Sequence, residues 1–387
     1  MTYQEITKLF NIELPDYVEQ YFDEFIKNYD RSKPLITRED VDFVCNATRL
    51  PDAAKNELIR CCELLNSNDS GHLCGSFMAD VLVYKRAPWL NYIEDPNLFT
   101  VEGLMPEQLG WVLVAVQLAF TLKTKNPPED LNRENTGAFN WYTHCCKRDN
   151  GYWGISEWTW NMLSAGGCMF VFGILKFCPA QFNGDFAVIT DGKRFVSLTA
   201  NEYFVGKEGE LVDCEEKSVG KTSFYEDDNK YIANVVAADG TVSLTATEFD
   251  KSVWKDYLRE GDKTLEIHIP SKIDYSPEAM KASFKEALEF YKGYYPEHNV
   301  KAIACYSWIY SAQLKKVLPA DSKILAVNRA VHILPCISSF GADCQFIRQG
   351  TSLQKRIADE CEKGTEFHFA VMYSPLDELE TFGKEVE

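Results

Sequence analysis

Hydrophobic residues follow a helical spacing in the first part of the chain and a strand-like spacing after about residue 166. In the first part they recur every three to four positions, which is the period of an amphipathic helix. The segment over residues 106–120 is apolar on almost every side, and we expect it at the centre of a helical bundle. We predict helices over residues 17–26, from residue 37 onward, and over residues 51–65, 70–85, 106–120 and 132–146.

Short apolar runs and turn signals replace this pattern in the middle of the chain. Residues 168–177 form a single β-rich run. Asp191-Gly192 and Asp239-Gly240 each lie between two such runs and are typical of hairpin turns. We expect a loop or a mobile hairpin in the acidic stretch 207–230 and a short helix or coil over residues 254–260.

The stretch from Lys263 to about Arg348 predicts strand, loop, helix, strand, helix and strand in succession. The first strand ends at Pro270, and Ser276-Pro277 begins a helix with a hydroxyl at the N-cap and proline at the first helical position. The next strand covers residues 300–308. Because a helix N-terminus offers free N–H groups and the positive end of a dipole, the loop before Ser276 is suited to an anionic ligand.

A helix over residues 352–363 and a strand over residues 366–372 complete the pattern. Together these elements predict an α+β protein, in which an all-helical N-terminal domain precedes a mixed α/β sheet domain. We place the two domains at residues 1–162 and 163–387. A chain of 387 residues is long enough to give each domain its own core.

The composition narrows the classes of partner. The net charge of −18 and the lack of a basic stripe argue against nucleic acid, whose phosphates bind clustered Lys and Arg. The acidic excess favours solubility first, and attraction of cationic substrates such as amines second. No window has the roughly 20 apolar residues of a membrane span, and the first residues lack the features of a signal peptide. We therefore expect a cytoplasmic protein without nucleic-acid or membrane partners.

Thirteen cysteines raise the questions of disulfides and of metal binding. In a long chain without a signal peptide, reduced thiols are the expectation. Two cysteine–histidine clusters are candidates for zinc, but neither has the paired C-x-x-C spacing of a strong zinc signature, and we predict no metal. These clusters are Cys61-Cys62 with His72 and Cys74, and His144-Cys145-Cys146.

Several segments of the second half carry a recognisable pattern in the same order along the chain. They are Phe170-Val-Phe-Gly-Ile-Leu-Lys-Phe177, Leu265-Glu-Ile-His-Ile-Pro270, Cys305-Tyr-Ser-Trp308, and residues 283–290, 295–297, 318–325 and 351–357. The second half thereby resembles the GNAT superfamily of N-acyltransferases. It is most similar to the C-terminal domain of GNAT-like proteins that also have a helical N-terminal domain.

This resemblance implies a co-substrate, acetyl-coenzyme A or another acyl-coenzyme A, and an amine of a small molecule or a protein as acceptor. The pantetheine arm would lie between the strands over residues 264–269 and 300–308 and bond to their backbone, as at Ile267 and Ile269. The pyrophosphate would lie on the loop before the helix, near Ser271, Lys272 and Ser276. The amine would enter from the opposite side.

The loop differs from the pattern of the family, in which two spaced small residues, usually glycine, let backbone N–H groups close around the phosphates. Residues 270–275 contain no glycine. Asp274 adds a negative charge near the expected phosphates, which Lys272 can offset. The loop therefore keeps open the alternative of a GNAT-like protein that does not use coenzyme A.

Acyl transfer to an amine requires a base for the amine and an acid for the leaving thiolate. Alternate residues of a strand share a face, so Glu266 and His268 point the same way. Because a buried charge is costly unless it is paired, these two are candidates for the base or a proton relay. The alternative is a solvated or structurally paired strand face. Tyr306 is the candidate acid, with a hydrogen-bonded core tyrosine as the alternative.

Two functional hypotheses remain after these considerations. The first is an acyl-coenzyme-A-dependent N-acyltransferase that acts by direct attack of the amine on the thioester, and Glu266 and His268 favour it. The second is a catalytically inactive GNAT-like binding or scaffold protein, which the missing glycines favour. Cys305 and Ser307 lack the sequence context of a thiol or serine nucleophile.

Overall fold

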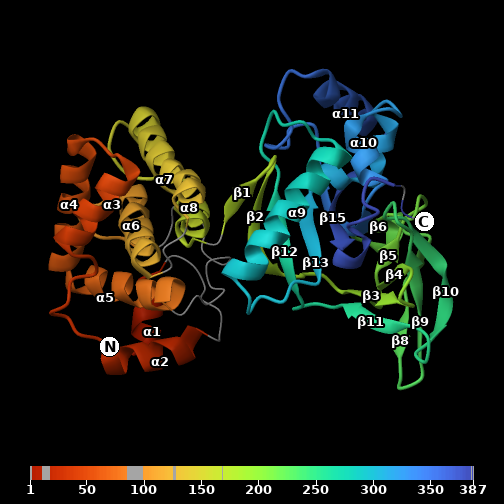
Figure 1. The fold of residues 1–387 in the computed structure, drawn as a ribbon, viewed down its shortest axis with the longest axis horizontal. Helices are drawn as coiled ribbons and strands as arrows, with labels where there is room; N and C mark the ends of the chain where they lie inside the picture. Colours follow the sequence, from red (N-terminus) through yellow and green to blue (C-terminus); the bar gives the residue numbers. More distant parts are fainter. Residues whose placement is uncertain are drawn as a thin grey trace. The chain divides into compact units, whose positions relative to one another are not determined.

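The computed structural model describes residues 2–10, 18–84, 99–124, 128–167, 169–384 and residue 386. The chain divides into two compact units, Met1–Phe170 and Val171–Glu387, and each contains its own hydrophobic core (Figure 1). The predicted α+β class is confirmed, because helices build the first unit and mixed sheets with helices build the second. Tyr17, Lys85 and Cys168, which end or begin predicted elements, lie outside the described residues.

The predicted helices of the first unit are confirmed, with ends that differ by a few residues. Their bounds are α1 Tyr3–Thr7, α2 Val18–Asn28, α3 Arg38–Thr48, α4 Asp52–Ser67, α5 Asp69–Met78, the π-helix η1 Ala79–Tyr84, α6 Pro106–Thr124, α7 Glu129–Asn150 and α8 Trp158–Ala165. As predicted, α6 is central: its side chains are buried on nearly every side, and it packs against α3, α4 and α8. None of the helices in the described part of the chain combines the length and the apolar character that a membrane span needs.

The described residues of the second unit form three sheets, of which the first begins at Phe170. The strands of the main sheet, in spatial order, are β1 Phe170–Phe172, β2 Leu175–Gln181, β12 Lys263–His268, β13 Ala302–Ser307, β15 Phe367–Pro375 and β14 His332–Phe340. The second sheet contains β10 Val242–Asp250, β9 Lys230–Val236, β4 Phe195–Thr199, β3 Phe186–Thr190 and β11 Lys255–Leu258, with β8 Phe224–Glu226 beside β9. The small third sheet contains β6 Leu211–Val212, β5 Phe204–Val205 and β7 Gly220–Lys221.

Helices complete this unit. They are α9 Pro277–Tyr294, α10 Lys323–Asn328, α11 Ser352–Glu362 and the short 3₁₀ segments η3 Glu215–Lys217, η4 Trp308–Tyr310, η5 Ala312–Lys316 and η6 Leu376–Glu378. Helix α9 joins β12 to β13 and lies beside these strands (Figure 1). The Tyr291 hydroxyl donates a hydrogen bond to the Phe177 carbonyl at 2.6 Å, and the Phe284 ring meets the Phe177 ring edge-on. These contacts fix α9 against β2.

Three sequence-based predictions for this unit need correction. The run over residues 168–177 is not one strand, because the chain turns between β1 and β2 at Gly173. Gly173 has φ +55°, and a Cβ there would lie 2.3 Å from the Ser283 Oγ of α9. Residues 254–260 contain the edge strand β11 instead of a helix or coil, since β11 pairs with β3. The acidic stretch 207–230, for which a loop or a mobile hairpin was expected, contributes short strands to two sheets.

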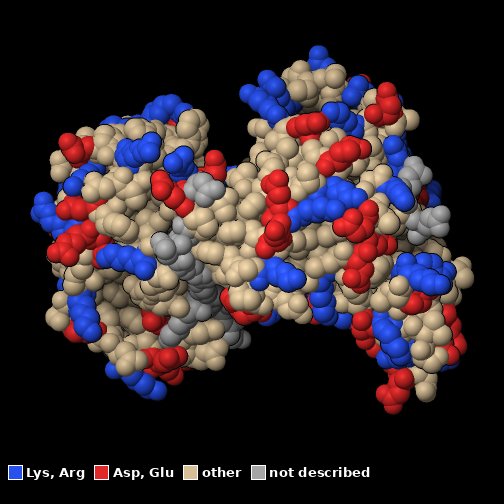
Figure 2. Space-filling view, in the orientation of Figure 1, with Lys and Arg blue, Asp and Glu red and all other residues tan. Residues whose placement is uncertain are grey.

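Acidic and basic side chains are interspersed over the visible face of the second unit (Figure 2). The described residues on that face form no continuous basic stripe of the kind that tracks a nucleic-acid backbone.

Candidate functional site

The central feature of the main sheet is a gap between its two parallel strands. Over the continuously described residues 169–384, β12 and β13 pair only from Thr264 opposite Ala302 to Glu266 opposite Ala304. Beyond these residues each strand continues and stays paired with its outer neighbour, β12 with β2 as far as His268 and β13 with β15 as far as Ser307. The two strands therefore diverge, as the family resemblance implies.

Glu266 and His268 lie on the same face of β12, as predicted, and Cys178 of β2 joins them. Glu266 is directly opposite Cys178 in the antiparallel pair, and His268 is opposite Lys176. The Cys178 Sγ lies 3.8 Å from the His268 Nε2. The thiol, the imidazole and the Glu266 carboxylate have ligand atoms within 4.8 Å of one another. One face of the main sheet thus holds three polar groups at the point where β12 diverges from β13.

Burial sets the charge state of this cluster. Desolvation raises the pKa of the Glu266 carboxyl above its ordinary value. Desolvation and, to a lesser extent, the positive charge of Lys176 together lower the pKa of His268 to about 4. His268 is therefore a neutral imidazole at neutral pH. Burial raises the pKa of the Glu266 carboxyl toward the working pH, so Glu266 is a candidate for the base.

Tyr306 lies on the opposite wall of the gap. The pairing of Glu266 with Ala304 and the alternation of the strand put Tyr306 on the same face of the sheet as Glu266 and His268. Its side chain is 50% exposed, its ring stacks on Phe369 with centroids 5.2 Å apart, and its hydroxyl shares a 2.8 Å hydrogen bond with Ser338 Oγ. Tyr306 is thus an exposed tyrosine held in place, and it is not a core residue.

The loop between β12 and α9 holds the other candidate residues. Ile267 is buried in β12, Ile269 follows the strand, and Ser271 and Lys272 are exposed. Lys272 has φ +64°, a left-handed conformation that glycine adopts at little cost and other residues adopt rarely. The chain therefore makes, with a lysine, a backbone bend that glycine adopts most readily.

Ser276 caps α9 as predicted. Its side chain accepts a hydrogen bond from the Ala279 N–H, and Pro277 is the first helical residue. Tyr275 anchors the loop to η4, because its buried hydroxyl donates a hydrogen bond to the Tyr310 hydroxyl at 2.9 Å. Two adjacent residues, Tyr275 and Ser276, thus hold the end of the loop in place where α9 begins.

Asp274, the acidic residue of the loop, has a partner that the sequence did not indicate. The Lys323 ammonium at the start of α10 forms an ion pair and hydrogen bond with the Asp274 carboxylate. Both side chains are exposed, so the pair contributes little to stability. It does offset the acidic charge and brings a second lysine, besides Lys272, to the loop in front of α9.

The sequence analysis missed Cys178, Lys323, Ser338 and Phe369. Each lies far along the chain from the residue it contacts, and Cys178 is separated from His268 by 90 positions. A strand pattern could place Cys178 on the same face as Lys176, but only the register between β2 and β12 brings it to Glu266. The two cysteine–histidine clusters considered for zinc do not gather as ligand groups among the described residues.

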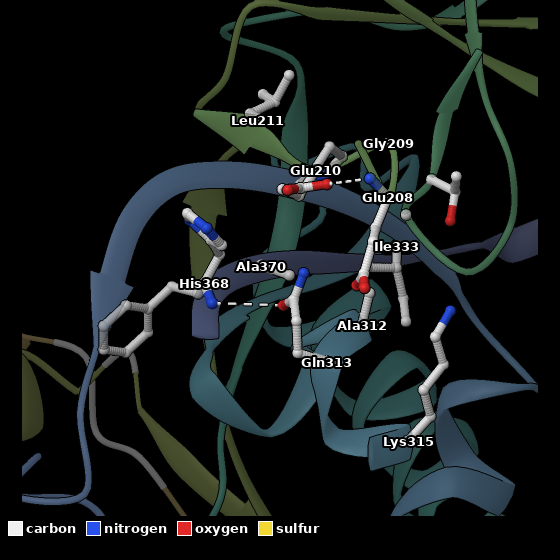
Figure 3. A pocket seen from close by; sticks show the side chains of 14 residues that line it. Glu208, Gly209, Glu210, Leu211, Ala312, Gln313, Lys315, Ile333, His368 and Ala370 are labelled. Atoms are coloured by element: carbon white, nitrogen blue, oxygen red, sulfur yellow. Dashed lines mark hydrogen bonds between the residues drawn. The ribbon is translucent and has the colours of Figure 1, made fainter. Parts of the chain in front are cut away.

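A pocket elsewhere in the second unit contains none of the candidate residues (Figure 3). It is lined by residues such as Glu208, Glu210, Gln313 and His368. Glu210 accepts a hydrogen bond from the Glu208 N–H and Gln313 accepts one from the His368 N–H, as the dashed lines in Figure 3 show. The buried His368 Nε2 has no hydrogen-bond partner in the described part of the chain. The candidate site is the gap between β12 and β13, where Glu266, His268 and Tyr306 lie on one face of the sheet.

Comparison with known proteins agrees with this architecture. Residues 169–371 match the family model described as the GNAT-like C-terminal domain. A solved acyltransferase mutant in complex with octanoyl-CoA is similar with a TM-score of 0.56 and 13% identity, over 97% of this chain and 100% of that one. An acyltransferase in complex with decanoyl-CoA and teicoplanin has a TM-score of 0.54 with the same identity and coverage. At this identity the likeness concerns the fold. No curated protein matches the sequence.

Proposed function

The chain belongs to the family of the GNAT-like C-terminal domain, and from this premise we propose that it is an acyl-coenzyme-A-dependent N-acyltransferase. The acyl group would pass directly from the thioester to an amine. The observation that supports this most is the divergence of β12 and β13 beyond Glu266 and Ala304, next to the capped N-terminus of α9.

The residues at the gap would bind the co-substrate at two places. Beyond Glu266 and Ala304 the facing edges of β12 and β13, including the backbone at Ile267 and Ile269, would bond to the pantetheine amides. The free N–H groups of α9, the hydroxyls of Ser271 and Ser276, and the ammonium of Lys272 would bind the pyrophosphate. Lys323 would assist, because it offsets the charge of Asp274.

The ionisable residues would carry out the proton transfers. Glu266 would accept a proton from the attacking amine, with neutral His268 as a relay. Tyr306, on the other wall, would donate a proton to the leaving thiolate. These roles require the amine to reach the face of the sheet that holds Glu266, His268 and Tyr306. The acceptor would be an amine of a small molecule or of a protein.

The similar structures guide the choice of ligands for a test. Two of them contain octanoyl-CoA or decanoyl-CoA, and one also contains teicoplanin, a small molecule. Medium-chain thioesters and small-molecule amines are therefore the first candidates for this chain. The test is amine-dependent release of free coenzyme A thiol from octanoyl-CoA by the wild-type protein, by Glu266→Gln and by the surface control Glu134→Gln.

The expected result is that Glu266→Gln lowers kcat by about 10²- to 10⁴-fold and leaves the affinity for octanoyl-CoA nearly unchanged. The control should equal the wild type, because Glu134 is exposed on the first unit. Full activity of Glu266→Gln would remove this carboxylate from the mechanism.

A binding or scaffold module is the second candidate function, because residues 270–275 contain no glycine and include Asp274. Thermal unfolding separates the two. Acyl-CoA at about a hundred times its dissociation constant should add about 2.7 kcal/mol of stability to a protein that binds it. No shift with acetyl-, octanoyl- or decanoyl-CoA would favour the second candidate.

A further inference from the structure

One cluster of side chains contains a group that the acyl-transfer chemistry does not require, and its members are Cys178, Glu266 and His268. A thiol, a carboxylate and an imidazole come within 4.8 Å of one another, and no other group of three such residues is this close in the described part of the chain. The thiol has no part in the proposed proton transfers. Thiolate and imidazole are, however, preferred ligands of transition metals.

The spacing of these atoms matches a tetrahedral metal site. With Zn–S and Zn–N bonds of about 2.3 and 2.05 Å, sulfur and nitrogen ligands of one tetrahedral ion lie about 3.6 Å apart. The Cys178 Sγ and His268 Nε2 are 3.8 Å apart. All three side chains project from two adjacent, paired strands, so their backbone positions are fixed by the sheet ladder. Small side-chain rotations would suffice to close the site.

The charges of the cluster also suit a divalent ion. Glu266 is partly buried beside the Cys178 thiol, and a cation stabilises a carboxylate that is taken out of water, whereas the His268 imidazole can offer a nitrogen lone pair. A thiolate and a carboxylate together cancel a charge of +2, so Lys176 beside His268 would face a neutral site. The soft thiolate selects Zn²⁺ over Mg²⁺ or Ca²⁺.

We propose that Cys178, Glu266 and His268 bind Zn²⁺ and that the bound ion blocks acyl transfer. Three protein ligands leave the fourth tetrahedral position open to water. The bound ion engages the Glu266 oxygen and the His268 nitrogen that would otherwise handle the proton of the amine. The blocking effect rests on the proposed function, whereas the binding does not.

Co²⁺ is the probe for binding, because a cobalt–thiolate bond produces a charge-transfer absorption band that oxygen and nitrogen ligands do not. The metal-free full-length protein should bind one equivalent of Co²⁺ with this band, and Zn²⁺ should displace it. Cys178→Ser should abolish the band, and His268→Gln should weaken binding at least tenfold. Cys361→Ser, which alters a partly exposed thiol of α11, should leave the band unchanged.

Absence of a saturable band in the folded wild-type protein, or a band that persists in Cys178→Ser, would overturn the metal site. Circular dichroism confirms that each variant is folded, and His268→Gln provides a second ligand test at the end of β12. Because these titrations contain no thioester, their outcome is independent of the transferase proposal.

Activity then tests the blocking effect. Zn²⁺ should suppress amine-dependent coenzyme A release, a chelator should restore it, and Cys178→Ser should resist inhibition at least tenfold better than Cys361→Ser. Zn²⁺ that binds at one equivalent and leaves the rate unchanged would overturn the blocking role. A protein that binds Co²⁺ as described but releases no coenzyme A under any condition would refute the proposed function and leave the metal site standing.

Discussion

The ion pair between Asp274 and Lys323 allows a quantitative test of where the pyrophosphate binds. If the phosphates lie on the loop before α9, Asp274 repels them and Lys323 attracts them. At a separation of about 8 Å and an effective dielectric constant of about 40, one pair of unit charges interacts by about 1 kcal/mol. That energy corresponds to about a fivefold change in affinity.

Asp274→Asn should therefore tighten octanoyl-CoA binding about fivefold, and Lys323→Ala should weaken it about fivefold. The double variant removes both charges and should bind within about twofold of the wild type. All three should unfold within about 1 kcal/mol of the wild type, because the two side chains are 59% and 66% exposed. The affinity differences should shrink in 1 M salt, where the Debye length falls to about 3 Å.

Isothermal titration calorimetry at low ionic strength measures these affinities directly. Dephospho-coenzyme A, which lacks the 3′-phosphate but keeps the pyrophosphate, should show the same changes. Equal affinity of Asp274→Asn and the wild type for octanoyl-CoA, together with equal affinity of Lys323→Ala, would refute a pyrophosphate site at this loop.

Three further perturbations test separate parts of the structure. Tyr306→Phe should lower kcat for coenzyme A release about 10²-fold with little change in unfolding, because only the hydroxyl is lost; an unchanged rate would exclude it as the acid. Burial lowers the pKa of His72, so the unfolded state binds more protons below pH 6.5. The free energy of unfolding should therefore decrease as the pH falls from about 6.5 to the lowered pKa of His72. Over that pH range the urea midpoint of His72→Gln should vary less than the midpoint of the wild-type protein. Gly173→Ala should lower the free energy of unfolding by about 1 to 2 kcal/mol, because its φ is +55° and the added Cβ would clash with Ser283 Oγ. As the control, the Cβ added by Gly293→Ala in α9 meets no atom within 4 Å and should not lower the free energy of unfolding. Equal urea midpoints for the two variants would contradict the packing of α9.

Local patterns in the sequence were sufficient for the order and type of most elements. The apolar segment of α6, the Ser276-Pro277 start of α9 and the two Asp-Gly hairpins are each determined by neighbouring residues, and each is confirmed. The edge strand β11 was missed because its pairing with β3 is a long-range contact that four residues cannot signal. Gly173 was read as part of a strand because the close approach of α9 is invisible along the chain.

The residues of the candidate site likewise divide into those that a local pattern indicated and those that depend on long-range contacts. Alternation along one strand placed Glu266 and His268 on a common face, and the structure confirms this. Their neighbour Cys178 depends on the register between β2 and β12, and the partner of Asp274 depends on the position of α10. The sequence pattern therefore could not indicate the contacts between distant segments. These contacts bring Cys178 into the proposed zinc site and Lys323 to the acidic residue of the loop.

A crystal structure of the protein with octanoyl-CoA bound would test the central claim most directly. The proposal predicts continuous density for the pantetheine arm along the facing edges of Ile267 and Cys305, with the pyrophosphate at the first turn of α9. A thioester seated anywhere else, or strands β12 and β13 that close on each other in the presence of saturating ligand, would contradict it.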